Sequence, residues 1–294
     1  LGVALAGPAK QKQLRYIHWV QDIFPEVAMT LGHRFTRISR GLRDRAWRGA
    51  DLCVTLGEDM AALLRERGVP AERIQLCPNW APGGLRAATP ESATSLREQW
   101  GLTGKFVVAY SGNLGRVHDF SSILPVAEAL RDEPAIALVF VGDGAQRSPL
   151  ENAARSRGLT NIHFHPPQPR DQLVETLALG DVHLVTLRER LVFPSKLYGI
   201  AAVGRPVLFI GPRDCEVART IESNGFGFAC TSLDVERITA SIREIRDDQG
   251  QRFARGSAAE DFSARYGRLH HATTRWLGLL VGKPLAGDHM NPSL

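Results

Sequence analysis

The sequence has few of the features that mark a disulfide-stapled protein, a metal site or a membrane span. It contains four cysteines, with no CxxC pair and no cysteine–histidine spacing that suits a metal ion. No apolar stretch approaches the roughly 20 residues that a membrane-spanning helix requires. The cysteines are therefore expected to be small, buried residues of a protein in a reducing compartment: Cys53, Cys77, Cys215 and Cys230.

The start of the chain also lacks a secretory signal. The opening LGVALAGPAK is too short for a signal peptide and has no charged first segment, which favours a cytoplasmic location. The first methionine is Met29. We therefore expect translation to start before Leu1, so that a preceding segment belongs to the protein.

Positive charge is in excess but is not concentrated anywhere. The formal net charge is +5, and no run of five or more like charges occurs. This spread argues against a nucleic-acid tail, and no motif of aromatic and basic residues accompanies it. A mildly basic enzyme with anionic substrates fits the charge, and so does a protein that rests on the inner, acidic face of a cell membrane.

Length and composition indicate a globular protein of two domains. The chain has 294 residues, of which 44% are apolar and 23% charged, and a domain usually takes about 150 residues. Over residues 1–80, apolar runs alternate with amphipathic segments, which predicts a parallel sheet in the C-terminal part of a first domain. The strands are expected at 14–20, 50–57 and 72–80, and the helices at 36–48 and 58–68.

The segment 81–97 is the expected linker, because its first part is rich in Ala, Pro, Gly, Ser and Thr. The alternation resumes over 98–260 with continuous apolar strands, which are typical of a sheet covered on both faces. We therefore predict an α/β fold with a doubly wound second domain that binds ligands at the carboxyl ends of its strands. A terminal helix at 261–280 and a polar tail complete the range 261–294. The expected strands are 105–112, 136–144, 161–167, 181–187 and 205–211, and the helices are 121–133, 148–158, 170–180, 194–204 and 234–245.

Three loops at these strand ends can bring the backbone close to a ligand. SGNLGRVHD (111–119) and VGDG (141–144) contain glycines that permit sharp turns. FPSK (193–196) opens a helix with Pro194 and with Ser195 as a capping residue. All three loops fall at the same edge of the predicted sheet.

An anion is the ligand that these loops suit. A helix N-terminus favours negative charge, and Lys196 stands in the first turn, where the dipole disfavours a cation unless an anion is shared. Arg116 adds a second cation, so the loops together predict a site for a pyrophosphate. Each loop alone is also compatible with an ordinary turn between a strand and a helix.

Other candidates for chemistry have less support. His163 and His165 share one strand face without a third metal ligand nearby. His18 and Asp22 flank a strand end and could be a catalytic dyad or structural residues. The sequence contains no GxSxG, GxxxxGK[ST] or HExxH motif.

The order of the motifs resembles that of the retaining glycosyltransferases of family four, which have the GT-B fold of two facing Rossmann-like domains. The resemblance covers nearly the whole chain. The segment 50–80 is similar to the end of the family's N-terminal domain, and YSGNLGR, FVGDG and PSKLYGIAAVGRPV are similar to its donor-domain blocks. HWVQDIFPE and PSKLYG resemble the branch that builds bacterial exopolysaccharides such as colanic acid.

The resemblance implies a nucleotide-diphosphate sugar of the UDP or GDP type as substrate, with no metal and no cofactor. In the family, the arginine of the SGNLGR-type loop meets the donor diphosphate, a role that falls to Arg116. The lysine that usually follows is absent, and we expect Lys196 to replace it. The expected diphosphate-binding residues are Gly112, Asn113, Gly115, Arg116, Pro194, Ser195 and Lys196; the expected nucleotide-binding residues are Gly142, Gly144, His165, Pro166, Glu189 and Gly199, with the base near 166–169.

Two departures from the family pattern bear on activity. The family has two glutamates separated by seven residues, and the corresponding positions here are Leu191 and Gly199. The second glutamate commonly holds the ribose hydroxyls, so this contact is expected from the backbone or from Glu189. The family also has further strand–helix units before the HWVQD-like strand, and we expect the first domain to be incomplete by about 100 residues.

The resemblance implies retaining transfer of a sugar to a glycan or lipid-linked glycan in cell-surface polysaccharide biosynthesis. Two alternatives stay open. A non-hydrolysing sugar-nucleotide 2-epimerase shares the fold and the donor, and would epimerise the donor without an acceptor. A non-catalytic nucleotide-sugar binding module is favoured by the absent glutamates and the truncated start, and would bind without releasing free nucleotide.

Overall fold

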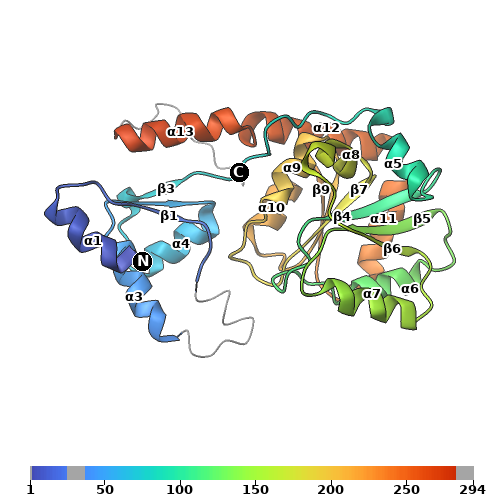
Figure 1. Ribbon diagram of the computed structural model, residues 1–294, viewed down its shortest axis with the longest axis horizontal. Coiled ribbons are helices and arrows are strands. Elements are labelled where there is room, and N and C mark those ends of the chain that lie inside the picture. Colours follow the sequence, from blue (N-terminus) through green and yellow to red (C-terminus); the bar gives the residue numbers. More distant parts are fainter. Residues whose placement is uncertain (1, 25–36, 283–294) are drawn as a thin grey trace.

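The computed structural model describes residues 2–24 and 37–282, which form two parallel sheets with helices around them (Figure 1). The first sheet has the strand order β1-β2-β3, and every residue of β2 is buried. From β1 onward the strands and the two longer helices follow the predicted order, which is therefore confirmed, whereas α1 and η2 were not predicted; residue 36 lies outside the described residues. The elements of this part of the chain are α1 (Gly2–Gln11), β1 (Ile17–Val20), α3 (Arg37–Arg48), β2 (Leu52–Thr55), α4 (Glu58–Glu66), the 3-10 helix η2 (Ala71–Arg73) and β3 (Ile74–Leu76).

The second sheet has six parallel strands in the order β6-β5-β4-β7-β8-β9. All six residues of strand β5 are buried, because helices cover both faces of the sheet. The strand order reverses between β4 and β7, which is where sheets of this kind form a crevice for ligands. The strands are β4 (Phe106–Ser111), β5 (Ile136–Val141), β6 (Ile162–His165), β7 (Val182–Thr186), β8 (Val207–Ile210) and β9 (Gly227–Cys230).

The helices of the second sheet confirm most of the predicted alternation. The sequence pattern does not predict α10 and β9, and the expected linker contains η3 and most of α5. Strand β9 is short and begins with Gly227, where a Cβ would lie 2.0 Å from the carbonyl oxygen of Val207. The helices are η3 (Pro90–Ala93), α5 (Thr94–Gln99), α6 (Ile123–Ala129), α7 (Arg147–Ser156), η4 (Arg170–Gln172), α8 (Leu173–Ala178), α9 (Lys196–Ala202), α10 (Glu216–Ser223), α11 (Val235–Asp247) and α12 (Gln249–Tyr266).

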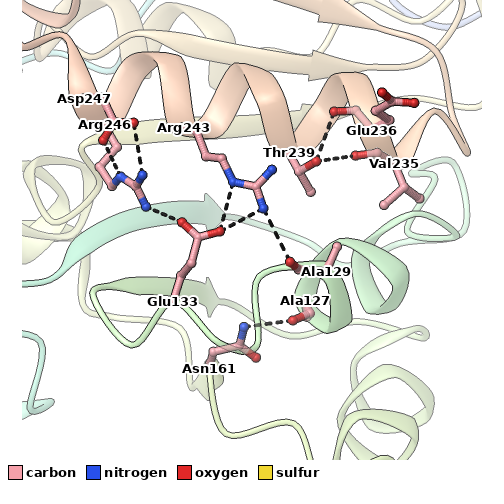
Figure 2. A network of polar contacts seen from close by, with 10 residues as sticks. All are labelled: Ala127, Ala129, Glu133, Asn161, Val235, Glu236, Thr239, Arg243, Arg246 and Asp247. Atoms are coloured by element: carbon pink, nitrogen blue, oxygen red, sulfur yellow. Dashed lines mark hydrogen bonds and ion pairs between the residues drawn. The ribbon is translucent and has the colours of Figure 1, made fainter.

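A cluster of charges fixes α11 to the loop that follows α6 (Figure 2). The Glu133 carboxylate accepts a hydrogen bond from Arg243 Nε at 2.9 Å and forms an ion pair with Arg246. The side chain of Asn161 donates to the carbonyl oxygen of Ala127 at 2.9 Å. Glu133 thus connects α11 to the loop after α6, and Asn161 connects the start of β6 to α6.

The expectation of one helix over 261–280 is wrong. Helix α12 ends at Tyr266, and a separate helix, α13 (Leu269–Val281), begins after a break at Gly267. A Cβ at this glycine would approach the ring of Tyr198 to 3.2 Å, so the chain turns where a side chain has little room. The expected boundary after residue 260 therefore falls inside α12.

Helix α13 returns to the first sheet and lies over it (Figure 1). Its Trp276 and Leu279 pack against a small apolar cluster of that sheet. The end of the chain therefore contributes to the first domain, and the polar tail after residue 282 lies outside the described residues. The cluster consists of Leu52, Val54 and Cys77, and the four cysteines, all in the described part of the chain, are buried and form no disulfide, as expected.

At the N-termini of α4 and α10, a carboxylate from each helix accepts a hydrogen bond from the backbone of the other helix. This exchange of hydrogen bonds connects the two domains. The backbone N–H of Asp59 donates to Glu216 Oε2 at 3.1 Å, and the backbone N–H of Glu216 donates to Asp59 Oδ2 at 2.7 Å. Arg219 forms an ion pair with Asp59. The Glu216 carboxylate occupies the space beside Gly57 in which a side chain would otherwise lie. Each helix thus receives a negative charge at the end where its dipole favours one.

Candidate functional site

A cavity of about 790 Å³ lies beside the point where the strand order reverses. The loops that follow β4, β5, β6 and β7 form most of its wall, and Trp80 and Pro82 reach it from the segment after β3. This volume suits a small organic ligand. The lining residues are Trp80, Pro82, Ser111, Gly112, Asn113, Val117, His118, Val141, Gly142, Asp143, Pro167, Gln168, Pro169, Arg170, Leu173, Thr176, Leu177, Val192, Pro194, Ser195, Lys196 and Gly199.

Glycines bring the loops after β4 and β5 into direct contact. Gly112 and Gly142 have φ angles of 129° and 149°, which glycine adopts readily. A Cβ on Gly142 would lie 2.0 Å from the carbonyl oxygen of Gly112. The N–H of Gly112 donates to the carbonyl oxygen of Val141 at 2.9 Å. Backbone rather than side chains therefore forms this part of the wall, as the glycine motifs predict.

Lys196 places a buried amine at the cavity. Its Nζ atom lies 3.7 Å from the centroid of the Tyr110 ring and has no hydrogen-bond partner among the described residues. The residue as a whole is half-buried, but the amine is shielded from solvent, and this desolvation lowers the pKa of Lys196 to about 7. A cation over an aromatic face gains some attraction, which does not replace the hydrogen bonds that an ammonium makes in water. An anion in the cavity would supply them.

His118 lies beside this amine in a neutral form. Its Nδ1 atom is 2.7 Å from the carbonyl oxygen of Thr186, so Nδ1–H is the donor and Nε2 is left as an acceptor. Burial and, secondly, the charge of Lys196 lower the pKa of His118 to about 4. The imidazole therefore adds no positive charge near neutral pH, and Lys196 carries the charge on this side of the cavity.

The structure brings about half of the expected site residues to the cavity. Arg116 is exposed and does not line it, so its contact with a diphosphate stays a prediction. The ring of His165 is turned toward Trp100, with centroids 3.6 Å apart and an interplanar angle of 5°. The lining members are Gly112, Asn113, Gly142, Pro194, Ser195, Lys196 and Gly199, whereas Gly115, Arg116, Gly144, His165, Pro166 and Glu189 lie outside the lining.

The expected catalytic dyad is not formed as a bonded pair in the structure. His18 Nδ1 is 2.9 Å from the hydroxyl of Tyr16, and burial lowers the pKa of His18. Asp22 is exposed, and neither residue lines the cavity. In residues 2–24 and 37–282, no group of three or more His, Cys, Asp and Glu residues could hold a metal ion. Across the same ranges, no helix combines the length and the apolar character needed to cross a membrane.

Several lining residues were not expected from the sequence. Helix α8 contributes Leu173, Thr176 and Leu177, and Trp80 comes from the segment before the linker. Helix α8 follows β6, so its position at the same sheet edge could have indicated a contact. Trp80 carries no such signal, because it reaches the cavity only through the packing of one domain against the other.

Comparisons with known proteins agree with this geometry. Residues 92–262 match the family model described as glycosyl transferases group 1. WcaI of Escherichia coli (strain K12), named as a colanic acid biosynthesis glycosyl transferase, is 29% identical over 80% of this chain and 61% of its own length. WbjE of Pseudomonas aeruginosa, named as a glycosyltransferase, is 29% identical over 79% of this chain and 60% of its own. The chain therefore spans less than two thirds of these relatives.

Solved structures share the fold at low sequence identity. HepE from Anabaena in complex with UDP-glucose has a TM-score of 0.80 at 18% identity, covering 96% of this chain and 76% of that one. WaaG, a glycosyltransferase involved in lipopolysaccharide biosynthesis, has a TM-score of 0.67 at 18% identity, covering 90% of this chain and 75% of that one. The chain belongs to the glycosyl transferases group 1 family and has the GT-B fold.

Proposed function

We propose that the protein transfers a sugar from a nucleotide-diphosphate sugar to a glycan or lipid-linked glycan acceptor, with retention of configuration, in cell-surface polysaccharide biosynthesis. The observation that carries this proposal is the amine of Lys196, which is buried at the cavity without a hydrogen-bond partner among the described residues. The family match and the name of WcaI support a transferase over an epimerase or a binding module.

The proposed donor lies along the cavity with its diphosphate at the Lys196 end. Asn113 and Ser195 are exposed in the same wall and offer polar atoms to phosphate oxygens. The base then lies toward the loop after β6, where Pro167, Gln168 and Arg170 line the cavity. Arg116 reaches the diphosphate only if its exposed loop closes over the ligand. HepE, which has been solved with UDP and with UDP-glucose, supports a donor of this class.

The proposed chemistry is electrostatic. As the bond between sugar and diphosphate breaks, negative charge grows on the leaving phosphate oxygens, and a positive group that already points at them lowers the barrier. Lys196 and, after loop closure, Arg116 supply that charge without a metal ion. In this account the cations act on the leaving group and the acceptor approaches across the cleft.

We also propose that the protein works at the inner face of the cell membrane. Helix α3 carries exposed Arg45 and Arg48 next to Leu42, whose side chain is 56% exposed. Basic and apolar groups side by side suit an anionic lipid surface. Co-sedimentation with phosphatidylglycerol vesicles but not with phosphatidylcholine vesicles is the expected result, and equal recovery with both would contradict this contact.

Calorimetric titration with UDP tests the donor site. We expect Lys196→Ala to weaken UDP binding about 10- to 100-fold, because hydrogen bonds to charged groups contribute about 1.5–3 kcal/mol. Arg116→Ala should weaken it less, because that side chain begins outside the cavity. Arg265→Ala is the matched control: it removes an exposed cation that pairs with Asp261 on α12, and it should leave the affinity unchanged. Unchanged affinity in both Lys196→Ala and Arg116→Ala would refute the proposed function.

A further inference from the structure

Gly199 forms an apolar part of the cavity wall. It is buried on α9, and the atoms nearest to the position of an added Cβ are Leu177 Cδ1 at 3.5 Å, Leu85 Cδ1 at 3.6 Å and Pro82 Cδ at 3.9 Å. These are ordinary van der Waals distances, so a Cβ atom at this position would fit. All three neighbours are carbon atoms, so the side chains nearest to this position are apolar.

Helix α8 contributes one polar side chain to the cavity lining, and this side chain is already engaged. Thr176 Oγ1 donates to the carbonyl oxygen of Gln172 at 2.8 Å. Among the lining residues, all of them in the described part of the chain, Asp143 is the only one with a carboxylate. Asp143 belongs to the loop after β5, and its Oδ1 accepts a hydrogen bond from the N–H of Gly144 at 2.8 Å. No carboxylate thus faces the wall between α8 and α9.

This wall lies between the two ends of the proposed donor. The diphosphate is placed at Lys196 on the first turn of α9, and the base at the loop after β6, so the ribose crosses the α8 and Gly199 region. Nucleotide-binding α/β folds commonly hold the ribose hydroxyls with an Asp or Glu carboxylate. A site built in that way rejects a ligand without the hydroxyl, because its own polar group then loses its partner. A wall without a carboxylate incurs no such loss.

We propose that this site does not distinguish ribose from 2′-deoxyribose in its donor, so that it accepts 2′-deoxynucleoside diphosphate sugars as well as ribonucleoside ones. The inference rests on the proposed function, since it concerns the same donor site. Gly199 is the residue that sets this tolerance, because a polar side chain at this lining position would lie at the wall that the ribose crosses.

Calorimetric titration of the whole chain with UDP and with dUDP tests the inference, because the two ligands differ by one hydroxyl. We expect dissociation constants that agree within threefold. A larger preference for UDP would overturn the inference while leaving the proposed function intact. Binding of neither nucleotide would instead refute the proposed function, and the inference with it.

Two variants test the role of Gly199. Gly199→Glu should raise the preference for UDP over dUDP about tenfold, because the new carboxylate can accept a hydrogen bond from the 2′-hydroxyl. Gly199→Ala is the control for added volume and should keep the ratio near one. The quantity compared is the ratio of the dissociation constants for dUDP and UDP. A general loss of affinity in Gly199→Glu therefore does not affect the conclusion. An unchanged ratio in a folded Gly199→Glu chain would show that the ribose does not cross this wall.

Discussion

The amine of Lys196 lies over the Tyr110 ring with its charge poorly solvated. Because burial lowers its pKa to about 7, the unfolded chain binds a proton at this site more strongly than the folded chain does. The buried amine therefore reduces the free energy of unfolding at neutral pH. A residue that weakens the fold and lines a cavity is typical of a binding site rather than of a structural core.

The pKa of Lys196 predicts how donor binding depends on pH. An anion next to the amine favours its charged form, so the pKa rises in the complex and the protein takes up a proton when it binds above pH 7. Affinity for UDP-glucose, whose phosphates do not titrate in this range, should be highest below pH 7. It should fall about tenfold for each pH unit above 7, until the pKa of the complex is reached.

Calorimetry at pH 6 and pH 8.5 measures this dependence. Lys196→Arg is the matched variant, because a guanidinium stays charged over the whole range and should remove the dependence. Equal affinities of the unaltered chain at the two pH values would show that the amine does not meet the phosphates.

Among the contacts between elements, the reciprocal hydrogen bonds between α4 and α10 should stabilise the molecule. Asp59→Asn and Glu216→Gln keep the side-chain shape but remove the charge at a helix N-terminus. Each should lower the free energy of unfolding by about 1–2 kcal/mol. The double variant should lose less than the sum, because the two residues share one set of contacts.

Urea unfolding of the single and double variants checks this prediction. Glu222→Gln is the control on the same helix, since Glu222 pairs with Arg213 in an exposed position, where an ion pair contributes about 0–1 kcal/mol. If Asp59→Asn and Glu216→Gln cost no more than this control, the exchange does not contribute to stability.

Some helices and strands can be predicted from the sequence, and others cannot. Strands such as β5 are continuous apolar runs between glycine-rich turns, and the pattern alone locates them. Strand β9 has only four residues and two small side chains, so its sequence pattern is too short to predict a strand. The break between α12 and α13 lies at Gly267, where an added Cβ would come within 3.2 Å of the Tyr198 ring, and this tertiary approach leaves no local pattern.

In the molecule as a whole, only part of the cavity lining can be predicted from the sequence. The loops around Gly112, Gly142 and Lys196 could be predicted, because each follows a strand of one parallel sheet and those ends meet at one edge. The approach of Trp80 could not be predicted, because it depends on how the first domain packs against the second. The turning of His165 toward Trp100 likewise depends on a helix that the pattern did not show.

In the proposed complex, Lys196 holds the diphosphate of a nucleotide donor in the cavity beside the β4–β7 reversal. A crystal structure of the chain with UDP would locate the phosphates. We predict Lys196 Nζ within about 2.7–3.2 Å of a phosphate oxygen, with the base against the loop after β6. A complex in which the phosphates lie elsewhere, and the amine remains over the Tyr110 ring without an oxygen partner, would contradict the account.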